Sequence, residues 1–276
     1  MSEEARGVAL VVAAVSSLQF GAGFAVTLFD ELGPAGAAFL RLAIAAAVLV
    51  ALWRPRVRGR PASDLRLAAA FGITLGLMNL CIYEAMDRIP LGIAVTIEFW
   101  GPLAVAVAGS RRPLDLLWVV LAAAGILLLA DPGGGSLDRD GIAFALAAGG
   151  LWAIYILLSA RTGQVWPGGT GLAIAMVCGA LVTLPAGLDA DLLQPELLAA
   201  GAALALASSV IPYSFELEAL RRLPARVFGV LMSLEPAVAA LAGLVVLGQA
   251  LGGVEWLAIA LVVVASAGAA NPRLRD

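Results

Sequence analysis

The sequence predicts an all-α membrane protein of ten transmembrane helices, arranged as two inverted five-helix repeats. The first observation behind this prediction is composition: 62% of the 276 residues are apolar and 13% are charged. Soluble domains average about 45–50% and about 25%. The mean hydropathy is +0.98, and a soluble globule cannot hide that much apolar surface because its exterior needs polar cover. The other two observations are the lengths of the apolar stretches and a match between the halves.

Ten apolar stretches are long enough to cross a bilayer. A membrane helix needs about 20 residues, because the hydrocarbon core is about 30 Å thick and a helix rises about 1.5 Å per residue. The first stretch runs directly into another, which favours an uncleaved helix over a signal peptide. The predicted spans are 7–28, 34–53, 66–86, 90–110, 114–130, 141–160, 168–187, 195–220, 224–247 and 253–270.

The placement of arginine predicts the orientation. All 17 basic residues are arginine, and loops on the cytoplasmic side of a membrane protein carry an excess of basic residues. With the ten spans above, fourteen arginines fall on one side, two fall on the other, and Arg41 lies within a span. We therefore expect a multi-pass protein with both termini in the cytoplasm.

The third observation is an internal match at a separation of 134 residues. At this separation Arg88-Ile89-Pro90 matches Arg222-Leu223-Pro224, Glu84-Ala85 matches Glu218-Ala219, and Pro102 matches Pro236. The predicted repeats are residues 1–132 and 133–276. Five spans per repeat is an odd number, so the second repeat enters the membrane inverted. Inverted repeats are typical of transporters, with the substrate site near the midplane; a duplicated scaffold without transport activity is the alternative.

Several chemistries are excluded by residues that the chain lacks. It has no histidine and no lysine, which excludes imidazole acid–base chemistry, a P-loop and a pyridoxal Schiff base. Its two cysteines, Cys81 and Cys178, lie in apolar stretches and support neither a disulfide framework nor a metal site. We expect no cofactor, no metal and no nucleic-acid partner. The oligomeric state stays open, a monomer included.

Five glutamates fall within the predicted spans. An acid at the middle of a transmembrane helix costs about 2.5–3.5 kcal/mol on insertion scales, so such residues are rarely accidental. Glu84 and Glu218 each precede an arginine by four residues, Arg88 and Arg222. This spacing and order favour ion pairs at helix ends.

The other three glutamates, Glu98, Glu216 and Glu235, are predicted to bind substrate and to carry protons. No arginine lies within one turn of Glu98. Pro102 and Pro236 are predicted helix kinks, because each proline lacks an N–H and frees a carbonyl four residues before it. The alternatives are a protonated acid bonded to a neighbouring helix, and prolines that only shape the helices.

Polar residues at helical spacing predict a central cavity. Ser209, Tyr213 and Glu216 share one helix face, and Gly72, Gly76, Asn79 and Tyr83 form a matching stripe in the third span. The glycines have close helix packing as their alternative. Arg41 is interpreted as structural, either reaching the outer face or pairing with a buried acid. The predicted substrate-binding residues are Gln19, Asn79, Tyr83, Glu98, Trp100, Trp152, Tyr155, Tyr213, Glu216 and Glu235.

Nearly the whole chain resembles EamA-type proteins of the drug/metabolite transporter superfamily, and it is most similar to the bacterial threonine/homoserine exporters. The resemblance implies a cavity open to one side at a time, export of small metabolites, and location in the bacterial inner (plasma) membrane. Glu98, Tyr213, Glu216 and Glu235 fall within the matching stretches. These stretches are 89–95, 98–99, 101–106, 110–113, 152–157, 212–214, 232–233 and 235–237.

The predicted function is therefore secondary export of small neutral amino acids such as threonine and homoserine, with protons as the coupling ion. The alternative is proton-coupled export of lipophilic cations or other small metabolites. An intramembrane enzyme would need a nucleophile, an acid and a metal in register, and the sequence offers no such set. A membrane scaffold would leave Glu98 unexplained.

Overall fold

The computed structural model describes residues 3–108, 113–130, 137–187, 194–220, 222–223 and 225–270, and these residues form helices without any strand. The predicted all-α class is confirmed. The elements are α1 (Glu3–Val26), α2 (Phe29–Trp53), α3 (Ala62–Arg88), α4 (Leu91–Glu98), α5 (Trp100–Val107), α6 (Pro113–Ala130), α7 (Arg139–Val165), α8 (Thr170–Gly187), α9 (Pro195–Ala205), a π-helical turn η1 (Leu206–Val210), α10 (Ile211–Leu220), α11 (Ala225–Met232), α12 (Glu235–Leu247) and α13 (Gly253–Ala270). The predicted boundary between the repeats, at residue 132, lies outside the described residues.

The helices are apolar both inside and outside the bundle. Five of them are long and apolar enough to cross a bilayer, and shorter apolar helices account for other predicted spans. Large apolar side chains also point outward, such as Leu52, Leu127 and Val245, which are 67%, 68% and 70% exposed. Water would penalise such a surface, whereas lipid tails would not. The fold is that of a multi-pass membrane protein.

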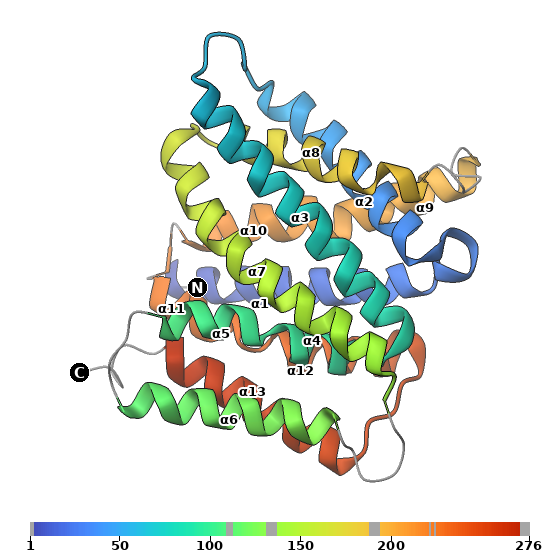
Figure 1. Ribbon diagram of the computed structural model, residues 1–276, viewed down its shortest axis with the longest axis vertical. Coiled ribbons are helices and arrows are strands. Elements are labelled where there is room, and N and C mark those ends of the chain that lie inside the picture. Colours follow the sequence, from blue (N-terminus) through green and yellow to red (C-terminus); the bar gives the residue numbers. More distant parts are fainter. Residues whose placement is uncertain are drawn as a thin grey trace.

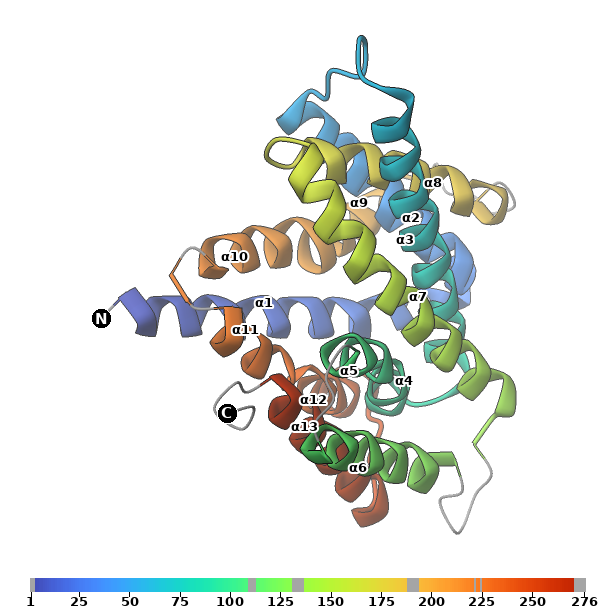
Figure 2. The same cartoon turned by 60° about the vertical axis from the view of Figure 1, so that its left-hand side comes forward.

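Helices from the two halves of the chain interleave rather than form separate bodies. Helices α2 and α3 contact α8, and α3 also runs beside α7 (Figure 1). On the other side of the bundle, α1 contacts α10 and α12, while α4 contacts α12 and α6 contacts α13 (Figure 2). The central space is therefore bordered by both halves.

Small residues allow this close packing where α3 crosses α8. A Cβ atom added at Gly72 would lie 2.3 Å from the carbonyl oxygen of Ala175, and one at Gly76 would lie 2.8 Å from that of Gly179. Both distances are too short for any side chain. The packing alternative for the two glycines is confirmed, so they shape the helix crossing.

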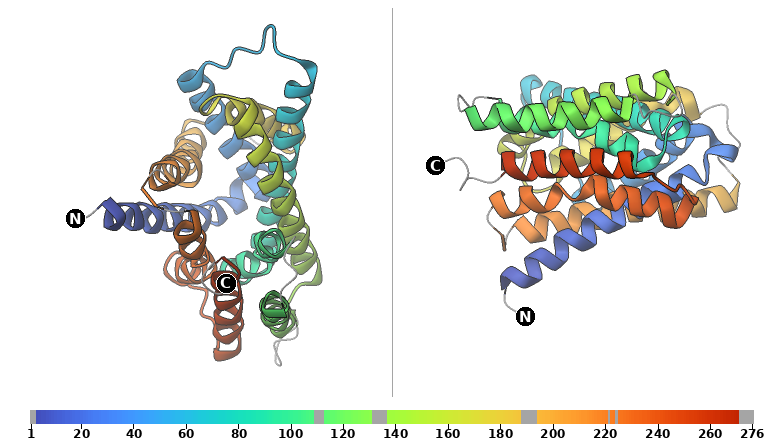
Figure 3. Two further views of the ribbon diagram at one scale, coloured as in Figure 1. Left: turned by 90° about the vertical axis from the view of Figure 1, so that its left-hand side faces the viewer. Right: turned by 90° about the horizontal axis from the view of Figure 1, so that it is seen from below.

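The start of α1 and the end of α13 lie at the same end of the bundle (Figure 3). This placement is what an even number of membrane crossings produces. The described part of the chain contains ten helical segments when α4–α5, α9–α10 and α11–α12 are each counted as one crossing.

Two crossings are broken at equivalent positions. Helix α4 ends at Glu98 and α5 starts at Trp100, while α11 ends at Met232 and α12 starts at Glu235. Each break begins three residues before a proline, Pro102 or Pro236, and the two breaks are 134 residues apart. A proline cannot donate the helical hydrogen bond to the residue four positions earlier, so the ladder is interrupted there.

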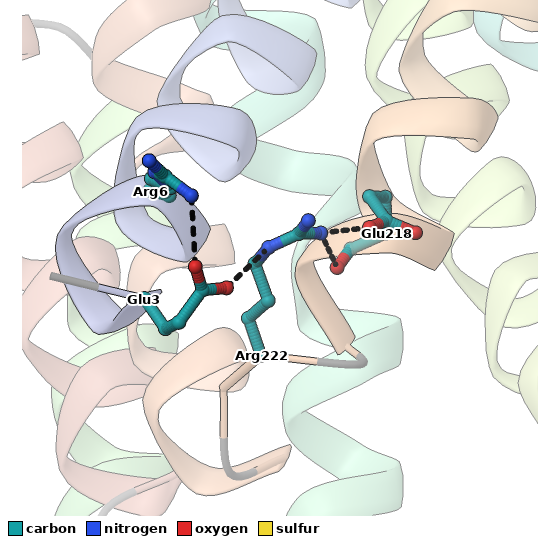
Figure 4. Close-up of polar contacts among 4 residues, drawn as sticks. All are labelled: Glu3, Arg6, Glu218 and Arg222. Carbon is teal, nitrogen blue, oxygen red and sulfur yellow. Dashed lines mark hydrogen bonds and ion pairs between the residues drawn. The ribbon is translucent and has the colours of Figure 1, made fainter. Parts of the chain in front are cut away.

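The two ion pairs predicted from four-residue spacing are confirmed. Arg88 pairs with Glu84, and Arg222 pairs with Glu218. Arg222 also lies 3.1 Å from Glu3, whose other carboxylate oxygen is 2.9 Å from Arg6 (Figure 4). This network joins the start of α1 to the turn after α10, so it ties two crossings together at one end of the bundle.

Candidate functional site

A cavity of about 170 Å³ lies between the two halves of the chain. A cavity of about 150 Å³ holds a molecule as large as benzene, so this one suits a solute of similar size. The structure brings eight of the ten predicted substrate-binding residues to its lining. They are Gln19, Asn79, Tyr83, Glu98, Trp152, Tyr155, Glu216 and Glu235.

The three predicted proton carriers reach the cavity from three different crossings. Glu98 is the last residue of α4 and Glu235 is the first of α12, so both stand at helix breaks. They are 7% and 2% exposed, and Glu216 joins them from α10. A broken helix leaves backbone and side-chain polar groups at the same depth, an arrangement that transporters use to bind solutes.

Glu235 is held by an amide from the other half of the chain. Gln19 in α1 donates from Nε2 to Oε2 of Glu235 at 3.2 Å. The amide oxygen of Gln19, Oε1, and the second carboxylate oxygen of Glu235, Oε1, are buried and have no hydrogen-bond partner among the described residues. A buried acceptor without a donor costs about 1–3 kcal/mol. The two oxygens therefore form an acceptor site for a donor that enters the cavity.

Arg41 lines the same cavity and is 7% exposed. Its guanidinium donates to the hydroxyl of Tyr83 at 3.1 Å, to the hydroxyl of Ser209 at 3.1 Å and to the carbonyl of Ser208 at 2.7 Å. Both serines belong to the π-helical turn η1, where the hydrogen-bond ladder is shifted from its α-helical register. Arg41 does not extend to the outer face, because these acceptors hold it inside.

Arg41 is the one buried arginine of the described residues. It lines the same cavity as Glu98. The sequence interpretation missed its place in the cavity. The available signal was its position: it is the one basic residue that lies several residues from either end of a predicted span.

Ring contacts fix the aromatic part of the wall. Trp152 packs edge-on against Phe99, with 5.2 Å between ring centroids, and Tyr155 lies 5.0 Å from Phe71. Asn79 donates from Nδ2 to the carbonyl of Leu75 at 2.9 Å. Its Oδ1 makes no hydrogen bond to any residue in the described part of the chain, so it can accept one from a solute.

Trp100 is not among the described residues that line the cavity. Trp100 instead donates from its indole N–H to the carbonyl of Leu146 at 3.0 Å and lies against Gly149 of α7. Because Trp100 follows the break at Phe99, its side chain leaves the face on which Glu98 lies. The side chain of Tyr213 lies outside what the structure describes.

Methionines make up a part of the lining that was not predicted. Met78, Met86 and Met232 all border the cavity. Methionine is equally common in apolar helix surfaces that face no cavity, so no sequence signal distinguishes these three. Their flexible side chains can adapt to solutes of different shape.

Comparison with known proteins gives concordant matches. Residues 139–270 match the EamA-like transporter family. The chain is 43% identical over 266 residues to the threonine/homoserine exporter RhtA of Salmonella typhimurium (strain LT2), covering 94% of this chain and 89% of the relative. It is 43% identical over 267 residues to RhtA of Escherichia coli (strain K12), covering 95% and 90%.

More distant matches agree with the fold. The uncharacterized transporter YwfM of Bacillus subtilis (strain 168) is 30% identical over 177 residues, which cover 62% of this chain and 57% of that protein. A crystal structure superposes with a TM-score of 0.63 at 22% identity, covering 97% of this chain and 98% of the other. At this identity the structural match shows a shared fold.

Proposed function

The chain belongs to the EamA-like transporter family, and from this premise we propose that it exports small neutral amino acids such as threonine and homoserine, driven by protons. Its relatives over most of the chain are exporters and not enzymes. The observation that carries the proposal is the lining of the cavity, which combines unpaired acceptors, carboxylates and a buried arginine.

Each group of a hydroxylated amino acid has a partner of matching chemistry. The ammonium would donate to the unpaired oxygens of Gln19 and Glu235, close to the carboxylate of Glu98. The carboxylate would accept from Arg41, and the hydroxyl would donate to Oδ1 of Asn79. A charged hydrogen bond contributes about 1.5–3 kcal/mol, so the two charged ends would dominate recognition.

The cavity disfavours the alternative substrate class, lipophilic cations. Drug-sized ligands occupy pockets of about 300–1,000 Å³, whereas this cavity has about 170 Å³. A cation would also be repelled by the charge of Arg41. A zwitterion meets a complementary charge at each end.

Substrate counterflow in proteoliposomes tests the function. We expect vesicles preloaded with threonine or homoserine to accumulate labelled threonine transiently, because exchange needs no external energy. Preloading with a lipophilic cationic dye should give no accumulation, while empty vesicles provide the background. Counterflow with the dye but not with threonine or homoserine would overturn the proposal.

The charge balance of the cavity supports the proposed proton coupling. Three carboxyl groups, those of Glu98, Glu216 and Glu235, share the cavity with one arginine. Three ionised carboxylates in an apolar space would repel one another strongly. Protons that bind and leave during the cycle would relieve this repulsion, which makes the glutamates the proposed carriers.

A proton gradient should therefore accelerate export. Threonine efflux from loaded proteoliposomes should be faster when the outer solution is more acidic than the interior, since inward proton flow then drives outward substrate flow. A protonophore should remove the difference, and Glu216→Gln should weaken it. Efflux rates that are equal with and without the gradient would indicate uncoupled transport.

The proposed topology has two inverted repeats, residues 1–132 and 133–276, and cytoplasmic termini. The equivalent breaks before Pro102 and Pro236 support the repeats. Clustered arginines at one end of the helices support the orientation. The described arginines of this group are Arg6, Arg54, Arg56, Arg58, Arg60, Arg66, Arg161, Arg222 and Arg226.

A reporter fused after Asp276 measures this orientation. A fluorescent protein that matures only in the cytoplasm should fluoresce, and alkaline phosphatase, which needs the periplasm, should stay inactive. The same pair of reporters inserted after Asp138, on the opposite side, should give the reverse result. Active phosphatase at Asp276 would contradict the proposed cytoplasmic C-terminus, and with it either the orientation or the even number of crossings.

A further inference from the structure

A second pocket lies at the end of the bundle where the turn between α2 and α3 meets the turn between α7 and α8. Its volume is about 360 Å³, and its lining includes Trp53, Arg54, Arg56, Arg60 and Trp166. The amino-acid transport cycle proposed above does not use this pocket. We propose that it binds the phosphate headgroup of an anionic phospholipid.

The pocket contains arginine charge that the protein itself leaves uncompensated. The guanidinium groups of Arg54 and Arg56 make no hydrogen bond or ion pair with any described residue. Arg60 is partly neutralised, since it lies 3.9 Å from the carboxylate of Asp64 and 4.7 Å from the ring centre of Trp166. Two guanidinium groups thus remain to bind an anion, and their planar donors match phosphate oxygens.

The backbone at Arg54 is strained in a way that the anion site would explain. Arg54 ends α2 with φ 42° and ψ 61°, a left-handed conformation. This position usually carries glycine, and the conformation costs an L-residue about 1–2 kcal/mol. Arg54 is the one non-glycine residue with positive φ in the described chain. The strain turns its side chain at the helix end toward the pocket lining.

Tight packing preforms one wall of the pocket. Gly168 has φ 56°, and a Cβ atom there would lie 2.6 Å from the Trp53 ring. A Cβ atom at Gly169 would lie 2.4 Å from the indole nitrogen of Trp53. The glycine turn therefore fits against the indole, and the ring is fixed beside the arginines.

The surroundings favour a lipid over a free phosphate ion, which would present the same chemistry. Apolar side chains beside the pocket are exposed: Leu52 by 67%, Val57 by 47% and Trp53 by 37%. Such a surface suits acyl chains, and tryptophan commonly lies at the level of the headgroups. Basic pockets at the cytoplasmic ends of transmembrane helices are typical binding sites for anionic headgroups.

Thermal unfolding of the purified full-length protein in detergent tests the proposal. The added probes are phosphatidylglycerol, phosphatidylcholine with the same acyl chains, and inorganic phosphate. We expect phosphatidylglycerol alone to raise the unfolding midpoint. In the double variant Arg54→Gln/Arg56→Gln, its affinity should fall about thirtyfold, the loss expected for two arginine contacts with an anionic headgroup.

The matched control is Arg58→Gln/Arg66→Gln, which removes the same charge from exposed residues that do not line the pocket. It should keep the wild-type affinity for phosphatidylglycerol.

An equal loss of affinity in both double variants would mean diffuse electrostatic attraction, and an equal response to both lipids would mean no headgroup recognition. A matching response to inorganic phosphate would assign the pocket to a free ion. Each of these results would overturn the proposal, and Arg56→Gln alone decides by the same criteria if the double variant does not purify. These lipid-binding results leave the transport proposal untouched, because threonine counterflow tests that proposal separately.

Discussion

Glu98→Gln should reduce threonine counterflow by about 10- to 100-fold and leave the protein folded in the membrane. The side chain is 7% exposed, lines the cavity and stands where α4 ends. Glutamine keeps the shape of the side chain but loses the negative charge, and a charged hydrogen bond contributes about 1.5–3 kcal/mol. The substitution also removes one of the three proposed proton carriers.

The control for this variant is Glu84→Gln. Glu84 also lies within a predicted span, but it pairs with Arg88 near the end of α3 and does not line the cavity. Both variants should elute as folded protein in size-exclusion chromatography, and the Glu84 variant should keep most of its transport. Normal counterflow by Glu98→Gln would place the substrate site elsewhere.

Arg41→Gln should abolish the preference for amino acids over the matching amines. The guanidinium is proposed to bind the substrate carboxylate, so its loss should weaken threonine binding by about 10- to 100-fold. Decarboxylated threonine, 1-amino-2-propanol, has no carboxylate and should not be weakened in the same way. The measurement is competition by each compound in the counterflow assay.

Two further variants separate recognition from folding. Arg41 also holds Tyr83 and the π-helical turn, so its loss will lower the thermal stability. Arg41→Lys keeps the charge without the planar fork and should give an intermediate preference. Tyr83→Phe removes one contact to Arg41 and should shift the preference in the same direction. A variant Arg41→Gln that still prefers threonine would exclude the proposed role.

The local features of this protein follow from its sequence. The helical segments are where stretches of about 20 apolar residues predict them, because bilayer thickness sets their length. The breaks in α4–α5 and α11–α12 precede Pro102 and Pro236, because proline lacks the N–H that the ladder needs. The pairs Glu84–Arg88 and Glu218–Arg222 form because residues four apart share a helix face.

The tertiary structure alone decided which of these groups meet. Gln19 reaches Glu235 across 216 residues of sequence, and Arg41 reaches Ser209 across 168. Trp100, two residues after Glu98, turns to α7 instead of the cavity. Sequence spacing determines which residues share a helix face, but the rotation of each helix about its axis depends on packing against its neighbours. For that reason, the sequence by itself determined the helices and the kind of polar groups they carry, and the packing of the two halves decided that Arg41 and the glutamates line one cavity.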